Sequence, residues 1–187
     1  MKDKFEEVTT HRETIFEGRI FTVAVDDVDL PNGGVSKREL VFHKGAVGAV
    51  VFTPEKKLVL VKQYRKAIER VSLEIPAGKL EVGENADLAG AMARELEEET
   101  AYRAVDLVRV ASMYSAIGFC NELVHVYYSK NLERVENPRP MDDDEVIEVY
   151  ELTLAEALAE VESGLICDAK TLYAVQLFEL LTLKGEL

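Results

Sequence analysis

The pattern of hydrophobic and polar residues predicts a chain made mostly of strands, with helices between and after them. Segments rich in Val, Ile, Leu and Phe favour strands over residues 15–30, 35–42, 45–52, 58–64, 71–75, 105–113, 122–128 and 146–152. Helix-forming segments with apolar stripes or capping signals predict helices over about 87–100, 154–162 and 168–183. Several strands between successive helices indicate an α/β protein with a mixed sheet covered by helices.

Residues at the ends of these segments support the assignment. Asp168 is placed to cap the last helix, Gly164 to stop the one before it, and Gly185 follows the last helix. The turn-forming run of residues 31–34 predicts that the first two strands form an N-terminal β-hairpin. We therefore divide the chain into an N-terminal β extension (1–43) and a main domain (44–187).

Composition limits the class of protein. The chain has 187 residues, 48% hydrophobic and 30% charged, enough for one domain with a sizeable core. It has no apolar run long enough for a membrane span and no signal-peptide core, so we expect a cytoplasmic protein without a membrane partner. The net charge of −13 argues against nucleic acid as a partner. Cys120 and Cys167 are expected to be reduced thiols.

The acidic segment of residues 94–99, Arg-Glu-Leu-Glu-Glu-Glu, lies in the first predicted helix. At helical spacing Glu95 neighbours both Glu98 and Glu99, and Arg94 lies one turn from Glu98. Like charges at this spacing repel each other, and a hard divalent cation such as Mg²⁺ would relieve the repulsion. The simpler alternative is a solvated acidic helix with ion pairs along its surface.

The segment resembles the Nudix box, G-x5-E-x7-R-E-U-x-E-E-x-G-U, where U is a bulky aliphatic residue. Gly78 and Glu84 match its first half and residues 94–102 match its second half. The chain departs from the pattern in its gap of nine residues between Glu84 and Arg94, and in having Tyr102 at the last aliphatic position. Ala101 replaces a Gly that commonly adopts the left-handed conformation, at a cost of roughly 1 kcal/mol.

The resemblance implies an α/β/α sandwich that hydrolyses a nucleoside diphosphate linked to another group, with Mg²⁺, or alternatively Mn²⁺, as cofactor. It implies that Arg94 orients a box carboxylate, and that the general base comes from a late acidic loop, with Glu145 favoured over Asp143. The implied catalytic residues are Glu145, Asp143, Glu98 and Arg94. The implied metal ligands are the carbonyl of Ala77 and the carboxylates of Glu95, Glu98, Glu99 and Glu145.

Segments outside the box resemble the ADP-ribose pyrophosphatase branch of the family. They are residues 63–65 (Gln-Tyr-Arg), 74–78 (Glu-Ile-Pro-Ala-Gly), 118–122 (Gly-Phe-Cys-Asn-Glu), 142–148 and 168–171. In that branch the residues matching Arg65 and Glu122 contact the substrate, and the extension pairs with a second subunit. The resemblance then implies that Arg38 or Phe21 reaches the nucleotide across the interface. Ile117 stands where the branch usually has Pro.

The sequence therefore predicts a homodimeric enzyme that hydrolyses ADP-ribose or a related ADP-sugar to AMP and a sugar phosphate. Two alternatives stay open. One is a Nudix hydrolase of another nucleoside diphosphate derivative, such as a GDP-sugar or a dinucleotide. The other is a domain that binds ADP-ribose without turning it over, against which the complete set of Glu95, Glu98 and Glu99 argues.

Overall fold

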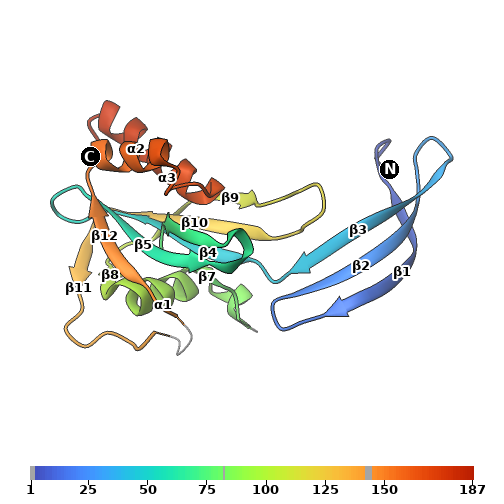
Figure 1. The fold of residues 1–187 in the computed structure, drawn as a ribbon, viewed down its shortest axis with the longest axis horizontal. Helices are drawn as coiled ribbons and strands as arrows, with labels where there is room; N and C mark the ends of the chain where they lie inside the picture. Colours follow the sequence, from blue (N-terminus) through green and yellow to red (C-terminus); the bar gives the residue numbers. More distant parts are fainter. Residues whose placement is uncertain (1–2, 82, 142–144) are drawn as a thin grey trace. The chain divides into compact units, whose positions relative to one another are not determined.

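The computed structural model describes residues 3–81, 83–141 and 145–187. The chain divides into two compact units (Figure 1). The first unit comprises Met1–Gly45 with Met113–Val124, and the second comprises Ala46–Ser112 with His125–Leu187.

The first unit contains an antiparallel sheet of strands β1 (Val8–Glu17), β2 (Phe21–Asp29) and β3 (Val35–His43), in that order. The predicted hairpin is confirmed as β2–β3, but the single strand predicted over 15–30 is wrong. A bend at residues 18–20 separates β1 from β2 there. β1 escaped prediction because nearly all of it is exposed on both faces, so hydrophobicity does not alternate along it.

An ion pair attaches β1 to its neighbour. Arg12 donates from Nε and Nη2 to the two carboxylate oxygens of Asp26, over 2.6 and 2.7 Å, and Thr9 adds a hydroxyl bond of 2.9 Å. Asp26 is buried. A two-pronged contact of this kind fixes the register of an edge strand that has little apolar surface of its own.

The second unit is built on two main groups of strands. They are β7-β4-β10-β9 and β12-β5-β6, with a small pair β11-β8. The strands are β4 (Ala46–Val51), β5 (Leu58–Arg65), β6 (Arg70–Glu74), β7 (Ala77–Lys79), β8 (Tyr102–Ala104), β9 (Val108–Tyr114), β10 (Leu123–Ser129), β11 (Leu132–Arg134) and β12 (Glu148–Leu152). The strands β7, β8 and β11 were not predicted, because three residues are too few to show a period.

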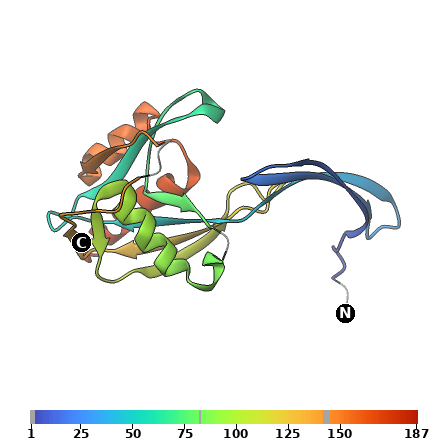
Figure 2. The same cartoon turned by 90° about the horizontal axis from the view of Figure 1, so that it is seen from below.

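Helices cover both sides of these strands. α1 (Leu88–Thr100) lies on one side, and α2 (Leu154–Ser163) and α3 (Ala169–Leu183) lie on the other, as Figures 1 and 2 show. The predicted α/β/α sandwich is confirmed. Asp168 caps α3 by accepting the N–H of Thr171, and Gly164 ends α2 in the left-handed conformation, both as predicted.

The core explains why β4 is a continuous apolar run. Val47, Ala49 and Val51 are fully buried in a cluster with Met92 and Leu96 of α1. The next residue, Phe52, packs instead against Phe178 of α3, with ring centroids 4.7 Å apart. Successive side chains therefore enter opposite layers, and no position along this strand meets solvent. No helix in the described part of the chain is long and apolar enough to cross a membrane.

Candidate active site

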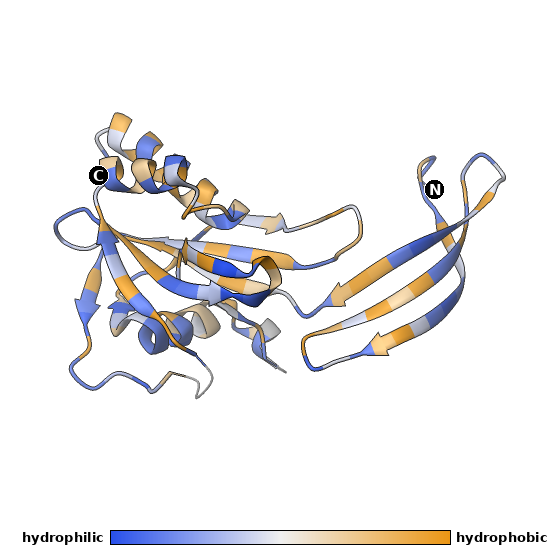
Figure 3. Ribbon diagram, in the orientation of Figure 1, coloured by the Kyte–Doolittle hydropathy of each residue, from blue (hydrophilic) through white to orange (hydrophobic). Residues whose placement is uncertain are grey.

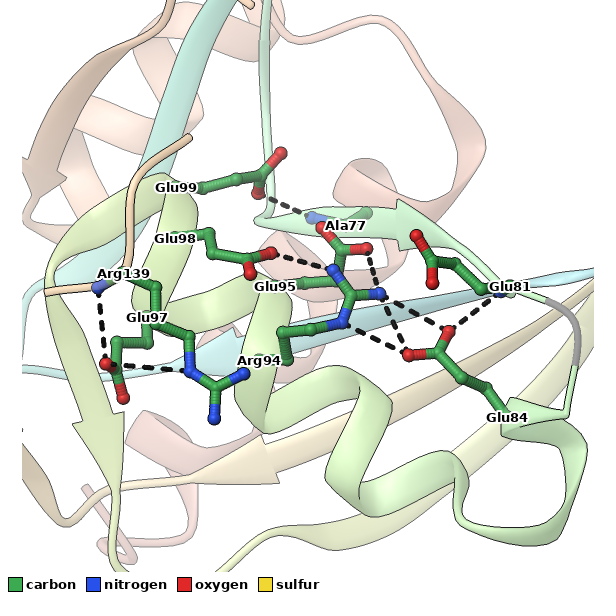
Figure 4. Close-up of polar contacts among 9 residues, drawn as sticks. All are labelled: Ala77, Glu81, Glu84, Arg94, Glu95, Glu97, Glu98, Glu99 and Arg139. Carbon is green, nitrogen blue, oxygen red and sulfur yellow. Dashed lines mark hydrogen bonds and ion pairs between the residues drawn. The ribbon is translucent and has the colours of Figure 1, made fainter. Parts of the chain in front are cut away.

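Helix α1 carries the box carboxylates, and its packing fixes their direction. Asp87 caps the helix by accepting the N–H of Gly90 over 2.9 Å. Met92 and Leu96 are buried against the sheet, which places Glu95 and Glu99 one turn apart beside strand β7 (Figure 4). The helix runs from residue 88 to residue 100, as the sequence predicted.

Arg94 connects three of the box glutamates. Its Nη1 donates to Oε2 of Glu98 over 2.7 Å, and its Nη2 lies 2.9 Å from Oε1 of Glu95 and 3.0 Å from Oε1 of Glu84 (Figure 4). Burial alone would lower the pKa of Arg94, but these carboxylates raise it. Arg94 thus holds the loop bearing Glu84 against the helix and fixes the rotamers of the carboxylates around it.

Two carboxyl groups of the box have raised pKa values, so that their ionisation is disfavoured. The pKa of Glu95 is raised to about 7 and that of Glu99 to about 8, chiefly by desolvation on burial and with a contribution from the charge of Glu145. The N–H of Ala77 donates to Oε2 of Glu99 over 3.0 Å and partly offsets this rise. The protein alone therefore disfavours ionisation of these two carboxyls, because it compensates their negative charge only in part.

The box Gly78 is required by close contact. The carboxyl group of Glu95 lies against the α-carbon of Gly78, so that a Cβ atom there would overlap all three atoms of the carboxyl group. Strand β7 and helix α1 approach each other this closely only because residue 78 has no side chain. The motif therefore combines Gly78 with Glu95 because the two residues pack directly against each other.

The chemistry of this set of donors fits a hard divalent cation. Glu95 and Glu99 supply oxygen ligands whose repulsion a cation would relieve, and such ligands suit Mg²⁺ and Mn²⁺. Among the described residues, no three His, Cys, Asp or Glu side chains converge into a ready-made metal site. In this arrangement Glu98 is engaged by Arg94, and Glu99 by the backbone of Ala77.

The late acidic loop is described only in part. Glu145 is exposed, and its charge raises the pKa values of Glu95 and Glu99, which places it within electrostatic range of the box. Asp143, the second candidate base, lies outside the described residues. Glu145 therefore lies in the neighbourhood of the box, and its role as general base stays a prediction.

Arg65, a predicted substrate residue, lies at the end of β5 in the same unit. It donates from Nε and Nη2 to the buried carboxylate of Glu74, over 2.6 and 2.7 Å. The charge of Glu99 contributes to raising the pKa of Arg65, so the guanidinium also lies within electrostatic range of the box. Sequence reasoning placed Glu74 in a motif but did not identify this contact.

The remaining predicted substrate residues lie in the first unit. Arg38 of β3 forms a two-pronged contact with Glu7, over 2.8 and 2.6 Å. Phe21 at the start of β2 packs against Phe16, with ring centroids 5.8 Å apart. Glu122 has a carboxylate oxygen 3.5 Å from Nδ1 of His43.

Glu97, inside the box, was not predicted to have a role. It is buried and turns away from Arg94. It accepts from Nη2 of Arg103 over 3.2 Å. It also accepts from the backbone N–H of Arg139 over 3.3 Å (Figure 4). Its spacing in the sequence gave no signal, because the position is variable in the motif and its partners lie outside the helix.

An α/β/α sandwich with Glu95 and Glu99 on α1, facing a glycine of the preceding strand, defines a Nudix-type domain. The chain belongs to the Nudix family. The NUDIX domain matches residues 42–171, and the nucleoside diphosphate sugar hydrolase N-terminal domain matches residues 7–41. The resemblance inferred from the sequence, including its ADP-ribose pyrophosphatase branch, is confirmed.

Individual relatives are similar over almost the whole chain. An ADP-ribose pyrophosphatase of Bacillus subtilis (strain 168) is 48% identical over 175 residues, 94% of each chain. A methanol dehydrogenase activator of Bacillus methanolicus is 47% identical over 176 residues, again 94% of each. A solved structure of an ADP compounds hydrolase superimposes with a TM-score of 0.83 over 100% of both chains, at 22% identity, and supports the fold.

Proposed function

We propose that this protein hydrolyses the pyrophosphate bond of ADP-ribose, or of a related ADP-sugar, to AMP and a sugar phosphate. The observation that carries the proposal is the pair of carboxyls on α1, half-buried Glu95 against Gly78 and buried Glu99 bonded to Ala77, whose ionisation a divalent cation would favour. The similarity to an ADP-ribose pyrophosphatase over 94% of the chain supports the choice of substrate.

The proposal includes a divalent cation, Mg²⁺ first and Mn²⁺ second. Glu95, Glu98, Glu99 and Glu145, with the carbonyl of Ala77, would hold it. When bound, such a cation neutralises phosphoryl oxygens and lowers the pKa of a coordinated water. Glu98 would serve as a ligand while Arg94 keeps its side chain directed at the site, a supporting role of the kind common around metal ligands.

The residues of the chain divide the rest of the reaction between them. Glu145 is the proposed general base and takes the proton of the attacking water, with Asp143 as the second candidate. Arg94 keeps Glu84, Glu95 and Glu98 in place throughout. Arg65 offers hydrogen-bond donors to phosphate or ribose oxygens, for which a guanidinium is well suited.

The first unit supplies the other proposed contacts. Glu122, Arg38 and Phe21 are proposed to bind the substrate, the last two from the extension of a second subunit. We propose a homodimer because apolar residues recur along the strands of the extension (Figure 3) and several of its large apolar side chains are exposed. These are Ile15, Phe16, Ile20, Phe21 and Val35. A cytoplasmic location, and a partner set limited to small nucleoside diphosphate sugars, belong to the same proposal.

Two other functions compete with this one. Hydrolysis of another nucleoside diphosphate derivative, such as a GDP-sugar or a dinucleotide, would use the same box, and Ile117 in place of the usual Pro leaves room for it. Binding of ADP-ribose without turnover is opposed by the complete carboxylate set.

A substrate screen separates these functions. ADP-ribose, other ADP-sugars, GDP-mannose, NADH and diadenosine compounds are incubated with the protein and Mg²⁺, and phosphate is measured after phosphatase treatment. We expect the highest kcat/KM with ADP-ribose or another ADP-sugar, and no turnover in EDTA. A preference for a GDP-sugar or a dinucleotide would favour the first alternative. ADP-ribose binding without turnover of any compound would favour the second.

A further inference from the structure

A cluster of four charged side chains lies where β5, β6 and α3 meet in the second unit. The carboxylate of Glu74 is almost completely buried, with a relative exposure of 3%. It accepts two bonds from Arg65, over 2.6 and 2.7 Å, and one from Nζ of Lys170, over 2.5 Å. Lys170 also donates to Asp168 over 2.9 Å. Two cations and two carboxylates thus balance one another.

This burial is costly unless every charge is paired. A lone carboxylate at this depth would be protonated or would destabilise the fold. Desolvation would raise the pKa of Glu74, but the bonds from Arg65 and the charge of Lys170 outweigh it and lower the pKa to about 2. Glu74 therefore remains an anion and stays hydrogen-bonded to the guanidinium of Arg65.

The geometry of the two hydrogen bonds between Arg65 and Glu74 leaves one end of the guanidinium available to another anion. Glu74 takes the side of the guanidinium formed by Nε and Nη2. Nη1 has no protein partner among the described residues, and the side chain as a whole is 40% exposed. The charge of Glu99 contributes to raising the pKa of Arg65, so the guanidinium lies in the neighbourhood of the box. A guanidinium can bind one oxygen pair along its side and another group at its end.

We infer that Glu74 is a positioning residue for the substrate. Clamped from one side by Glu74, Arg65 presents its Nη1 end to a phosphate or ribose oxygen of the nucleoside diphosphate sugar. Lys170, from the first turn of α3, aligns Glu74 and so links this helix to the site. The inference rests on the proposed function, in which Arg65 binds substrate. Glu74 itself touches no substrate, because the clamp and burial enclose it.

A purely structural cluster predicts a different result. If Glu74 served only to join α3 to β6, its loss would reduce activity by the same factor whether or not Arg65 is present. If Glu74 acts through Arg65, its loss matters only while Arg65 is present. A double-mutant cycle distinguishes the two cases, since coupled residues are not additive.

The experiment compares wild type, Glu74→Gln, Arg65→Ala and the double variant, with ADP-ribose and Mg²⁺. We expect Glu74→Gln to lower kcat/KM by about 10- to 100-fold, the range for groups that orient a functional side chain. In the Arg65→Ala background the same change should cost less than about twofold. Multiplicative losses, or an unchanged kcat/KM in Glu74→Gln, would overturn the inference.

Controls make each outcome decisive. Glu69→Gln removes an exposed carboxylate that pairs with Lys66, close to Arg65 in sequence, and should leave kcat/KM unchanged. If Glu74→Gln does not fold, Glu74→Asp replaces it in the double-mutant cycle. This variant retains the negative charge, but its shorter side chain moves the carboxylate away from Arg65. If wild type binds ADP-ribose without turnover, the proposed function fails and calorimetric affinities decide the inference. If wild type neither binds nor hydrolyses it, both fail.

Discussion

At the scale of single residues, Glu99 combines burial, a backbone hydrogen bond and a raised pKa in one proposed metal ligand. Its carboxylate is buried, accepts the N–H of Ala77 and has its pKa raised to about 8. Replacing it with Gln preserves its shape and removes a charge that burial disfavours. The fold should therefore survive while the proposed metal ligand is lost.

We predict that Glu99→Gln lowers kcat by roughly two to four orders of magnitude, the scale for loss of a main electrostatic element. The matched control is Glu97→Gln, on the same helix but turned toward Arg103 and Arg139, which should stay within about tenfold of wild type. Steady-state kinetics with Mg²⁺ and thermal unfolding check both. Near-wild-type turnover in Glu99→Gln, together with indifference to EDTA, would remove the metal assignment.

Gly78 allows a second prediction at this scale. A Cβ atom at this position would overlap the carboxyl group of Glu95. Gly78→Ala should push Glu95 out of place and lower kcat by about 100-fold, the cost of a displacement near 1 Å at a reacting centre. Gly48→Ala is a control on the paired strand β4, where the nearest atom is a side-chain carbon of Ile75. Equal activity losses in both variants would contradict the role of Glu95.

The residues of the box could be recognised from the sequence, but the contacts that support them could not. Gly78, Glu84, Arg94 and the three glutamates form a motif with fixed spacing, so their proximity could be predicted. The contact between Glu74 and Lys170 joins residues 96 apart in sequence. Only the packing of α3 against β6 creates it, and no periodic pattern encodes a contact at such a separation.

At the scale of elements, α1 ends in a conformation that its sequence tolerates poorly. Ala101 has φ of 58°, the left-handed region, and its N–H bonds to the carbonyl of Glu97. The strain anticipated from the replaced Gly of the motif is therefore present. Tyr102, directly after it, is buried, which shows why the chain must turn there.

Ala101→Gly should raise the free energy of unfolding by about 1 kcal/mol, because Gly adopts this conformation without the penalty of a Cβ atom. For a chain of this length the melting temperature should rise by about 2–4 °C. Ala159→Gly, at an exposed position inside α2, is the matched control and should lower stability by about 0.5–1 kcal/mol. Calorimetry that finds both variants destabilised would contradict the strain.

The cluster joining β6 to α3 gives a prediction of pH dependence. The pKa of Glu74 is about 2 in the folded protein, below its ordinary 4.5. A carboxyl with a lowered pKa stabilises the fold fully above its unfolded pKa and loses that contribution as the pH falls through its folded pKa. The groups that pair with it are the guanidinium of Arg65 and the amine of Lys170.

The stability advantage of wild type over Glu74→Gln should therefore be greatest above about pH 5 and should shrink toward about pH 2. Urea unfolding of the metal-free proteins between these limits measures it. Glu69→Gln, in an exposed ion pair, should show almost no difference from wild type at any pH. A difference for Glu74→Gln that is constant with pH would show that the carboxylate is not specially stabilised.

The helices and strands were predicted well where one face of the element, or the whole element, is buried. The helices α1, α2 and α3 begin and end within one residue of prediction, since caps and apolar stripes agree there. β12 begins at Glu148 rather than at residue 146 because the preceding segment is exposed and unpaired in the sheet. The strand β1 was missed for a related reason, because an edge strand without a buried face has no hydrophobic period.

At the scale of the whole molecule, the sandwich has a large buried core, whereas the extension is a single sheet that leaves large apolar side chains in solvent. β1, β2 and β3 form a sheet in which Ile15, Phe16 and Val35 are more than half exposed, at 56%, 52% and 80%. A thin sheet with apolar side chains left in solvent is marginally stable and gains from a second surface. A second copy of the chain, related by a twofold axis, is the commonest such surface.

We therefore predict a particle mass of twice 20.9 kDa by light scattering at micromolar concentration. The double change Ile15→Lys and Phe16→Lys places charge on two neighbouring exposed apolar positions of β1. It should shift the mass toward that of one chain and reduce activity, since Arg38 and Phe21 are proposed to act across the interface. Val105→Lys, at a 65% exposed position of the second unit, should change neither. A monomeric wild type, with full activity after deletion of residues 1–42, would refute both the dimer and the shared site.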